Sequence, residues 1–114
     1  MNREQELAIW RRWRQGHTVV VSMRKGVNPR MIRWAQENGL LVRVDRATRW
    51  GNPFRMHHES ERQEVIERYR RWLQTQPQLL ERLPELKGKV LACWCHPKPC
   101  HADVLAELAD ATGG

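Results

Sequence analysis

Three cysteines and two histidines lie within nine positions near the C-terminal end of the chain, from Cys93 to His101. Thiols and imidazoles act as nucleophiles, as acid–base groups and as metal ligands. The cluster follows a strand-like run over residues 89–94 and precedes a helix-like run that begins near Ala102. Because α/β folds place their ligand sites at such strand-to-helix corners, this segment is the first candidate for a functional site.

The order of residues in the cluster favours a thiol site at the start of the last helix. Free N–H groups and the helix dipole at that position attract an anion and lower the pKa of a thiol. Cys100 is therefore the predicted nucleophile, and His101 is its predicted acid–base partner, with His96 as a substitute. Cys95 and Asp103 complete this corner, where Asp103 either caps the backbone or orients an imidazole.

Two other interpretations of the cluster stay open. Sulfur and imidazole ligands suit zinc, and Cys93, Cys95, Cys100 and His101 would be its ligands. Cys93 and Cys95 share one face of a strand, but a C-x-C pair and an adjacent Cys-His step depart from the usual spacing of structural zinc sites. In the third interpretation the cysteines only pack in the core, as cysteine often does.

A second polar segment follows the strand predicted over residues 40–44. Arg46 and Arg49 are suited to hold a phosphate, and Trp50 to stack on a base. Gly51 permits a close approach of backbone or ligand, and Asn52 is predicted to hydrogen-bond a base or sugar. The ends of parallel strands meet at one sheet edge, so this segment should lie beside the Cys/His corner. The alternative is that Trp50 fills the core.

Hydrophobic periodicity predicts the elements that position these residues. Helices are predicted over residues 3–15, 30–38, 60–74, 77–86 and 101–111, and strands over 17–23, 40–44 and 89–94. Residues 1–39 then supply an N-terminal helix and a first strand–helix unit. The strand–helix–strand succession over residues 17–44 implies a parallel pair. The expected architecture is one domain over residues 1–114, a small three-layer α/β fold with a mostly parallel sheet of about three strands flanked by helices.

Charge indicates the kind of partner. The chain carries a formal charge of +7, with 20 basic and 13 acidic side chains. Residues 1–58 hold 12 of the basic and 4 of the acidic groups, a balance of +8, and 16 of the 20 basic residues are arginine. Arginine contacts phosphate in two-point geometry, so a nucleotide or nucleic acid is the expected partner. The alternative is an ordinary Arg-rich solvated surface. The oligomeric state is not indicated.

No apolar run approaches the length of a membrane span or of a signal-peptide core. We therefore expect a cytoplasmic protein with no membrane partner. An odd number of cysteines, crowded at one end, is not a disulfide framework, so reduced thiols are expected.

The segments Trp50-Gly-Asn-Pro-Phe54 and Cys93-Trp-Cys95, with the later Cys100-His101 step and Asp103, resemble the domain-of-unknown-function family 4326 of bacteria and phages. The resemblance covers about residues 40–112, and residues 1–39 match less well. It implies no established activity. It does imply one shared site made of Arg46, Trp50, Gly51, Asn52, Pro53, Cys93, Cys95, Cys100, His101 and Asp103.

The sequence is thus compatible with three alternative functions. The first is a nucleotide- or nucleic-acid-binding domain with a phosphate and thiol site at the strand-to-helix corner. The second is a zinc-stabilised nucleic-acid-binding module without catalysis. The third is a phage-type protein-interaction module that uses the N-terminal helix, in which Trp10 and Trp13 alternate with arginines. Whether the protein is an enzyme is left open.

Overall fold

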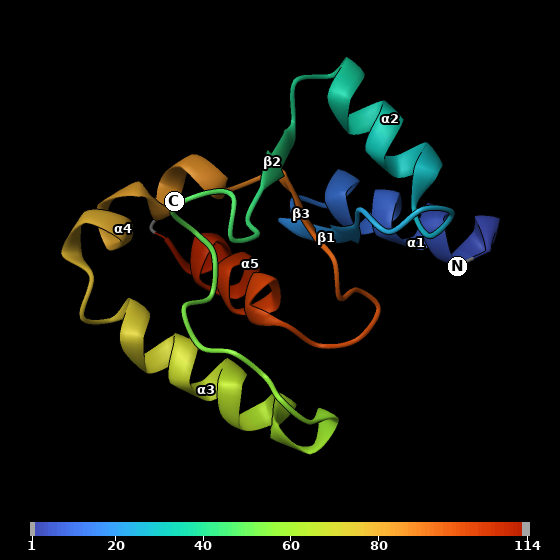
Figure 1. Ribbon diagram of the computed structural model, residues 1–114. Coiled ribbons are helices and arrows are strands. Elements are labelled where there is room, and N and C mark those ends of the chain that lie inside the picture. Colours follow the sequence, from blue (N-terminus) through green and yellow to red (C-terminus); the bar gives the residue numbers. More distant parts are fainter. Residues whose placement is uncertain (1, 113–114) are drawn as a thin grey trace.

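The computed structural model describes residues 2–112 and folds them around a three-stranded sheet (Figure 1). The strands are β1 (Val19–Ser22), β2 (Leu41–Arg43) and β3 (Val90–Cys93). The helices are α1 (Arg3–Arg14), α2 (Pro29–Glu37), α3 (Arg62–Leu73), α4 (Pro77–Arg82) and α5 (His101–Ala111), with short 3₁₀ turns at Glu59–Glu61 and Leu83–Leu86. The predicted small α/β domain is confirmed. No helix within residues 2–112 combines the length and the apolar character needed to cross a bilayer.

All strands are parallel, but their order differs from the one expected. The sheet runs β1-β3-β2, with Val20 and Val42 both opposite Leu91. We predicted that the strands over 17–23 and 40–44 would pair directly, and that prediction is wrong. The last strand, which is buried on both faces, inserts between them and makes the most apolar strand the central one. The loops after β2 and β3 therefore start from adjacent strands.

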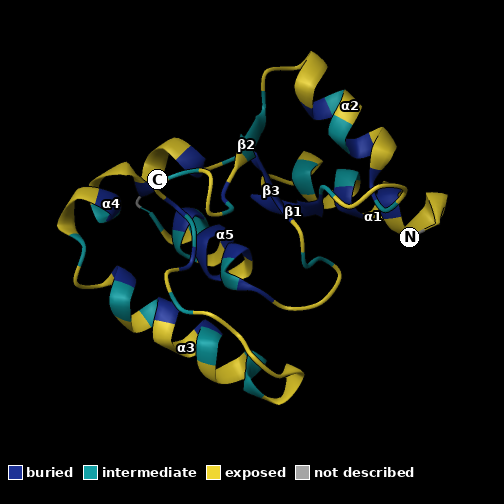
Figure 2. Ribbon diagram, in the orientation of Figure 1, coloured by how far each residue is buried: buried dark blue, intermediate teal, exposed yellow. Residues whose placement is uncertain are grey.

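Alternating side chains of the sheet divide the core in two. Val19, Val21, Val90 and Ala92 face α1 and α2. Val20, Leu91 and Cys93 face the opposite way, toward the helices of the C-terminal half. Figure 2 shows β1, β3 and the inner side of α5 buried, while β2 is only partly buried and α3 keeps an exposed outer face. The fold thus has three layers, and the Cys93 side chain points from the sheet toward the layer that contains α5.

Tryptophans of the N-terminal helix are partly buried and pack against α2. Trp13 lies edge-on to Trp34 of α2, with ring centroids 4.6 Å apart, and its Nε1–H donates to the Gly88 carbonyl at 2.8 Å. Glu6, 4% exposed, accepts the Met31 N–H at 3.0 Å near the start of α2. The aromatic residues of this helix are thus part of the fold and connect α1 to α2 and to the turn before β3.

The third helix begins differently from the prediction. A helix was predicted over residues 60–74, but a 3₁₀ turn at Glu59–Glu61 comes first, and the Glu61 carboxylate accepts the His58 N–H at 3.0 Å. From Arg62 onward the helix lays Ile66, Tyr69 and Leu73 against the core. The buried Tyr69 hydroxyl donates to the Trp50 carbonyl at 2.8 Å and ties α3 to the loop after β2.

Candidate functional site

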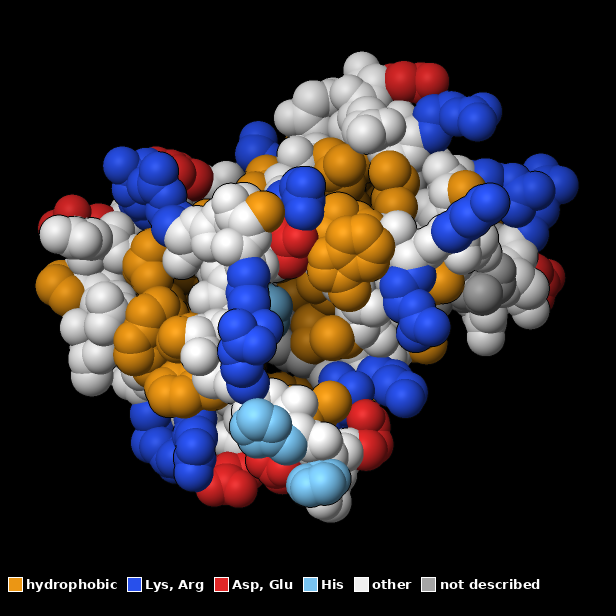
Figure 3. All heavy atoms as spheres, in the orientation of Figure 1, with side chains coloured by type: hydrophobic (Ala, Val, Ile, Leu, Met, Phe, Trp, Pro, Cys, Tyr) orange, Lys and Arg blue, Asp and Glu red, His pale blue; other side chains and the backbone are white. Residues whose placement is uncertain are grey.

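A cavity of about 330 Å³ opens at the carboxyl edge of the sheet, between the loops after β2 and β3 and the first turns of α3 and α5. On the face seen in Figure 3, a hollow with hydrophobic walls lies near the centre and basic side chains stand around it. The residues lining the cavity come from four segments: Asp45, Arg46, Asn52, Phe54, Met56, Arg62, Val65, Ile66, Cys93, Trp94, Cys95, Pro99, Cys100 and His101. The two motifs singled out in the sequence therefore do meet at one cavity.

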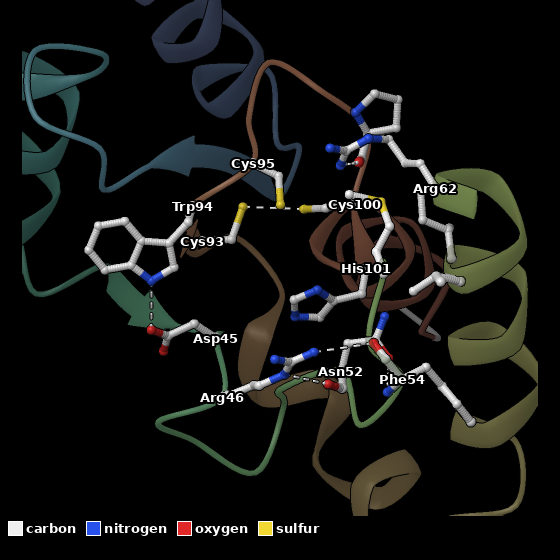
Figure 4. Close-up of a pocket in the computed structure, with 14 residues that line it drawn as sticks. Asp45, Arg46, Asn52, Phe54, Arg62, Cys93, Trp94, Cys95, Cys100 and His101 are labelled. Carbon is white, nitrogen blue, oxygen red and sulfur yellow. Dashed lines mark hydrogen bonds between the residues drawn. The ribbon is translucent and has the colours of Figure 1, made fainter. Parts of the chain in front are cut away.

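One wall of the cavity carries an exposed indole. Trp94 follows β3 directly and, at 50% exposed, is the most exposed large hydrophobic side chain within residues 2–112. Its Nε1–H donates to Asp45 Oδ2 at 2.9 Å (Figure 4). Arg43 donates to both oxygens of the same carboxylate. Hydrogen bonds from Arg43 and Trp94 keep the pKa of Asp45 below its usual value. Trp94 is thus an exposed aromatic surface held in one orientation.

Arg46 lies at the cavity because the following loop folds back onto it. Its Nε donates to the Asn52 carbonyl at 3.0 Å and its Nη2 to the Phe54 carbonyl at 3.3 Å. This return requires Gly51, since a Cβ there would lie 2.5 Å from the Cα of Arg46. Gly51 therefore acts through backbone packing, and Arg46 is exposed to solvent and to the cavity.

Other residues of this loop depart from the roles predicted for them. Trp50 is 5% exposed and packs in the core, so the expected stacking surface is not available there. Asn52 is buried and accepts the Phe54 N–H through Oδ1 at 2.9 Å, which shapes the loop, although it also lines the cavity. Arg49 is exposed and is not among the described residues that line the cavity. The structure brings Arg46, but not Arg49, to this site.

Across the cavity from Trp94, the first residue of α3 bridges to the cysteine loop (Figure 4). Arg62 donates through Nη1 to the Pro99 carbonyl at 2.8 Å and pairs with Glu59 through Nε at 2.8 Å. It also hydrogen-bonds Cys95, a half-buried thiol that lines the cavity. A hydrogen bond from Cys100, assisted by Arg62, lowers the pKa of Cys95 to about 6.

The three thiols form a cluster at the bottom of the cavity. The sulfurs of Cys93 and Cys100 are 3.2 Å apart, and Cys100 also hydrogen-bonds Cys95. Hydrogen bonding to Cys93 and Cys95, together with burial, raises the pKa of Cys100, which is 5% exposed. The pKa of Cys93 is lowered, chiefly by the hydrogen bond with Cys100. Cys95 is therefore the more acidic, and Cys100 the less acidic, of these two thiols.

Histidine and carboxylate groups complete the corner. Nε2 of His101 lies 2.6 Å from the Val44 carbonyl oxygen, which can only accept, so Nε2 carries the proton in this contact. Burial lowers the pKa of His101, and also that of His96, so both imidazoles are neutral at pH 7. Asp103 accepts the Cys100 N–H at 3.0 Å and is thereby a helix cap, the simpler of its two predicted roles.

The zinc interpretation gains no support from this geometry. Within residues 2–112, no group of three or more His, Cys, Asp or Glu side chains is arranged to hold a metal ion. His101, one of the four predicted ligands, directs Nε2 at the Val44 carbonyl.

Trp94 and Arg62 line the cavity but were not predicted from the sequence to do so. Trp94 was assigned to the end of the strand predicted over residues 89–94, and Arg62 to the first turn of the helix predicted over residues 60–74. The available signal for Trp94 was its place between Cys93 and Cys95, because neighbouring strand residues point to opposite faces. No signal in the sequence connects Arg62 with a loop that lies 37 positions away.

Comparison with known proteins adds a family and a phage relative. The sequence profile of the family described as domain of unknown function (DUF4326) matches residues 27–111, so the match begins before residue 40 and takes in α2. The chain is 32% identical over 73 residues to an uncharacterized 12.4 kDa protein in the nrdA-td intergenic region of Enterobacteria phage T4. That alignment covers 60% of this chain and 67% of the phage protein. No solved structure matches the chain.

Proposed function

The chain belongs to the family described as domain of unknown function DUF4326, and from that premise we propose that its cavity binds a nucleotide, as a free molecule or at a nucleic-acid end. The observation that carries the proposal is the combination of an oriented, exposed Trp94 and a cationic Arg46 on one cavity of about 330 Å³. A volume of that order is typical of small-ligand sites.

The base and the phosphate of a nucleotide each have a matching group in the cavity. A base would stack on the Trp94 indole, and stacking on an aromatic side chain contributes about 1–3 kcal/mol per base. A phosphate would face the Arg46 guanidinium, whose Nε and Nη2 hold the loop while the group stays exposed. Phe54 and Met56 add apolar surface at the same cavity. No other part of the ligand is specified by these contacts.

Within this proposal the reactive group is Cys95, with Cys100 and His101 in support. The sequence suggested Cys100 as nucleophile, but a buried thiol with a raised pKa attacks poorly. Cys95 is open to the cavity and hydrogen-bonded by Arg62, and its pKa of about 6 makes it a thiolate at neutral pH. A thiolate next to a bound base or sugar is suited to nucleophilic attack on that ligand.

Calorimetric titration tests the binding proposal with four probes: adenosine monophosphate, adenosine, ribose 5-phosphate and inorganic phosphate. We expect the monophosphate to bind most tightly, and Trp94→Ala to weaken both adenosine compounds while leaving ribose 5-phosphate unchanged. Arg46→Lys should weaken the monophosphate more than adenosine. Arg49→Ala is the matched control, since Arg49 is an exposed arginine of the same loop that does not line the cavity.

Two results would overturn the proposal. One is the absence of measurable heat with adenosine, uridine and guanosine monophosphates at millimolar concentration and with a short single-stranded oligonucleotide. The other is binding that Arg49→Ala weakens as much as Arg46→Lys does, because the charge of the surface would then suffice without the cavity.

A further inference from the structure

We propose that the nucleotide site extends from the cavity into a second, adjoining pocket, which holds a further phosphate linked to the first. This inference rests on the proposed function and specifies its ligand as a nucleotide with two linked phosphates. The adjoining pocket has a volume of about 320 Å³ and is lined by Arg46, Thr48, Gly51, Asn52, Pro53 and Arg55. Arg46 and Asn52 line the cavity as well, so the two spaces share a border.

Asn52 places an unused donor at this border. The residue is 8% exposed, and its Oδ1 accepts the Phe54 N–H at 2.9 Å, which leaves Nδ2 as the free end of the amide. Nδ2 donates to no residue that the structure describes. Within residues 2–112 every fully buried side-chain N or O atom has a partner, so Nδ2 must open onto the spaces that Asn52 lines. A buried amide donor of this kind is suited to an acceptor on a ligand, such as a phosphate oxygen.

Arg46 presents a second unused donor at the same border. Its Nε and Nη2 donate to the Asn52 and Phe54 carbonyls, which fixes the orientation of the guanidinium (Figure 4). Its Nη1 has no hydrogen bond to the described part of the chain. A guanidinium held through one edge can still bind phosphate oxygens through its remaining N–H groups. Because Arg46 lines both spaces, it adjoins a phosphate on either side of the border.

The charge of the loop calls for more than one phosphate. Residues 46–58 contain three arginines and no acidic side chain. Arg55 is exposed and forms no ion pair or hydrogen bond with residues 2–112. Asp45, which precedes this segment, is already bound by Arg43 and Trp94. A single phosphate at Arg46 would leave the charge of Arg55 uncompensated, whereas a second, linked phosphate in the adjoining pocket would pair with it.

Two kinds of nucleotide offer this chemistry. In a nucleoside diphosphate the two phosphates are joined directly, and in a nucleic-acid strand a sugar separates them. Either ligand would supply the acceptor for Asn52 Nδ2 and the anion for Arg55. The Thr48 hydroxyl is not one of the donors, since it donates to the Asp45 carbonyl at 3.1 Å. The test therefore includes one ligand of each kind.

Calorimetric titration at fixed salt and without divalent cations compares adenosine monophosphate, adenosine diphosphate and the 5′-phosphorylated dinucleotide of adenosine. We expect the diphosphate, the dinucleotide or both to bind roughly tenfold or more tightly than the monophosphate, because hydrogen bonds to charged groups are strong. A gain for the diphosphate alone identifies a free nucleotide as the ligand. A gain for the dinucleotide alone identifies a nucleic-acid strand.

Three variants show where the gain arises. Arg55→Ala should remove most of it. Asn52→Asp should do the same, because its carboxylate still accepts the Phe54 N–H but replaces the amide donor with an acceptor. Arg49→Ala is the matched control and should keep the gain, since Arg49 is an exposed arginine of the same loop that is absent from the lining of both spaces. If Asn52→Asp fails to fold, the comparison of Arg55→Ala with Arg49→Ala decides the question.

Equal affinities for the three ligands would overturn this inference and leave the proposed function standing. A gain that persists in Arg55→Ala would also overturn it. So would a gain that Arg49→Ala lowers as much as Arg55→Ala does, because the overall charge of the loop would then act without the adjoining pocket. If none of the three ligands binds, the proposed function and this inference are both wrong.

Discussion

The indole Nε1 of Trp94 and the carboxylate of Asp45 are joined by a 2.9 Å hydrogen bond that connects the ends of two adjacent strands. Asp45 comes after β2 and Trp94 after β3, so the pairing of those strands brings the two side chains together. The bond keeps a half-exposed aromatic ring at the cavity instead of leaving it to move in solvent. A ligand that stacks on the ring therefore meets a surface that is already ordered.

We predict that Asp45→Ala weakens the binding of adenosine monophosphate even where Asp45 makes no contact with it. Ordering one free side chain on binding costs about 0.5–1.5 kcal/mol, which corresponds to a roughly two- to tenfold loss of affinity. Asp45→Asn should retain most of the affinity, because its amide oxygen still accepts the indole N–H. Calorimetry on the two variants checks this. Equal losses in both would show that the charge of Asp45, and not the orientation of Trp94, controls binding.

The acidity of Cys95 gives a pH prediction. Its pKa of about 6 lies below that of an ordinary thiol, so the thiolate fraction, and with it the rate of alkylation by iodoacetamide, should rise from pH 5 to pH 7 and then level off. An ordinary thiol, with a pKa of about 8.5, would still react faster with each step in that range. Mass spectrometry of the labelled Cys95 peptide at several pH values measures the midpoint.

Arg62→Ala should move that midpoint upward, since it removes a cation and a hydrogen bond from the thiolate. Arg68→Ala is the matched control, because Arg68 lies on the same helix and pairs with Glu64 at the surface. If Arg62→Ala keeps its fold and the pH midpoint of Cys95 alkylation does not move, the hydrogen bond from Cys100 alone accounts for the lowered pKa of Cys95. A midpoint near 8.5 in the native protein would contradict the whole account of the thiolate.

Much of this architecture could be predicted from the sequence, and the errors have specific causes. Periodicity located α5 at residues 101–111 as observed, and placed α2 within one residue, because each helix has a clear stop or start signal. The order of the strands was missed, since β1 and β2 both pair with β3, which lies 71 positions after Val19 and 49 positions after Leu41, and local pattern carries no information on such pairing.

The site was predicted in its location and less well in its roles. Cys93, Cys95, Cys100, His101, Arg46 and Asn52 meet at the cavity as expected. The stacking surface was predicted at the wrong tryptophan. Trp50 is buried in the core, whereas Trp94 is exposed, although both stand beside polar motifs. Which of two similar residues faces solvent depends on the packing of α3 and α5 against the loops, and that packing is a tertiary property.

A fourth prediction, on Gly51, tests whether this glycine acts only on stability or also on the position of Arg46. Gly51→Ala should lower the free energy of unfolding by about 1–3 kcal/mol or more, because the new methyl group would collide with the backbone of Arg46. It should also weaken adenosine monophosphate binding by displacing Arg46. Gly39→Ala has no atom within 4 Å of the new methyl group, but its φ of +65° disfavours a side chain. It should cost about 1–2 kcal/mol and leave binding unchanged.

Urea denaturation and calorimetry on both glycine variants provide the two measurements. If Gly39→Ala weakens binding as much as Gly51→Ala, loss of stability alone explains the effect. If Gly51→Ala is as stable as the wild type, the loop can move away from Arg46 at no cost, and the position of that arginine is not fixed by the glycine.

The last prediction concerns the N-terminal helix, which the sequence also offered as a surface for a protein partner. Trp13→Phe removes an indole N–H from the Gly88 carbonyl and should destabilise the protein by about 1 kcal/mol more than Trp10→Phe. Trp10 is the matched control, since it lies on the same helix and also packs edge-on against Trp34. The difference in unfolding free energy reports on the hydrogen bond, because both substitutions replace an indole by a phenyl ring on the same helix and beside the same Trp34. Equal effects would mean that α1 is held by apolar packing alone, and its tryptophans would then be exchangeable within the fold.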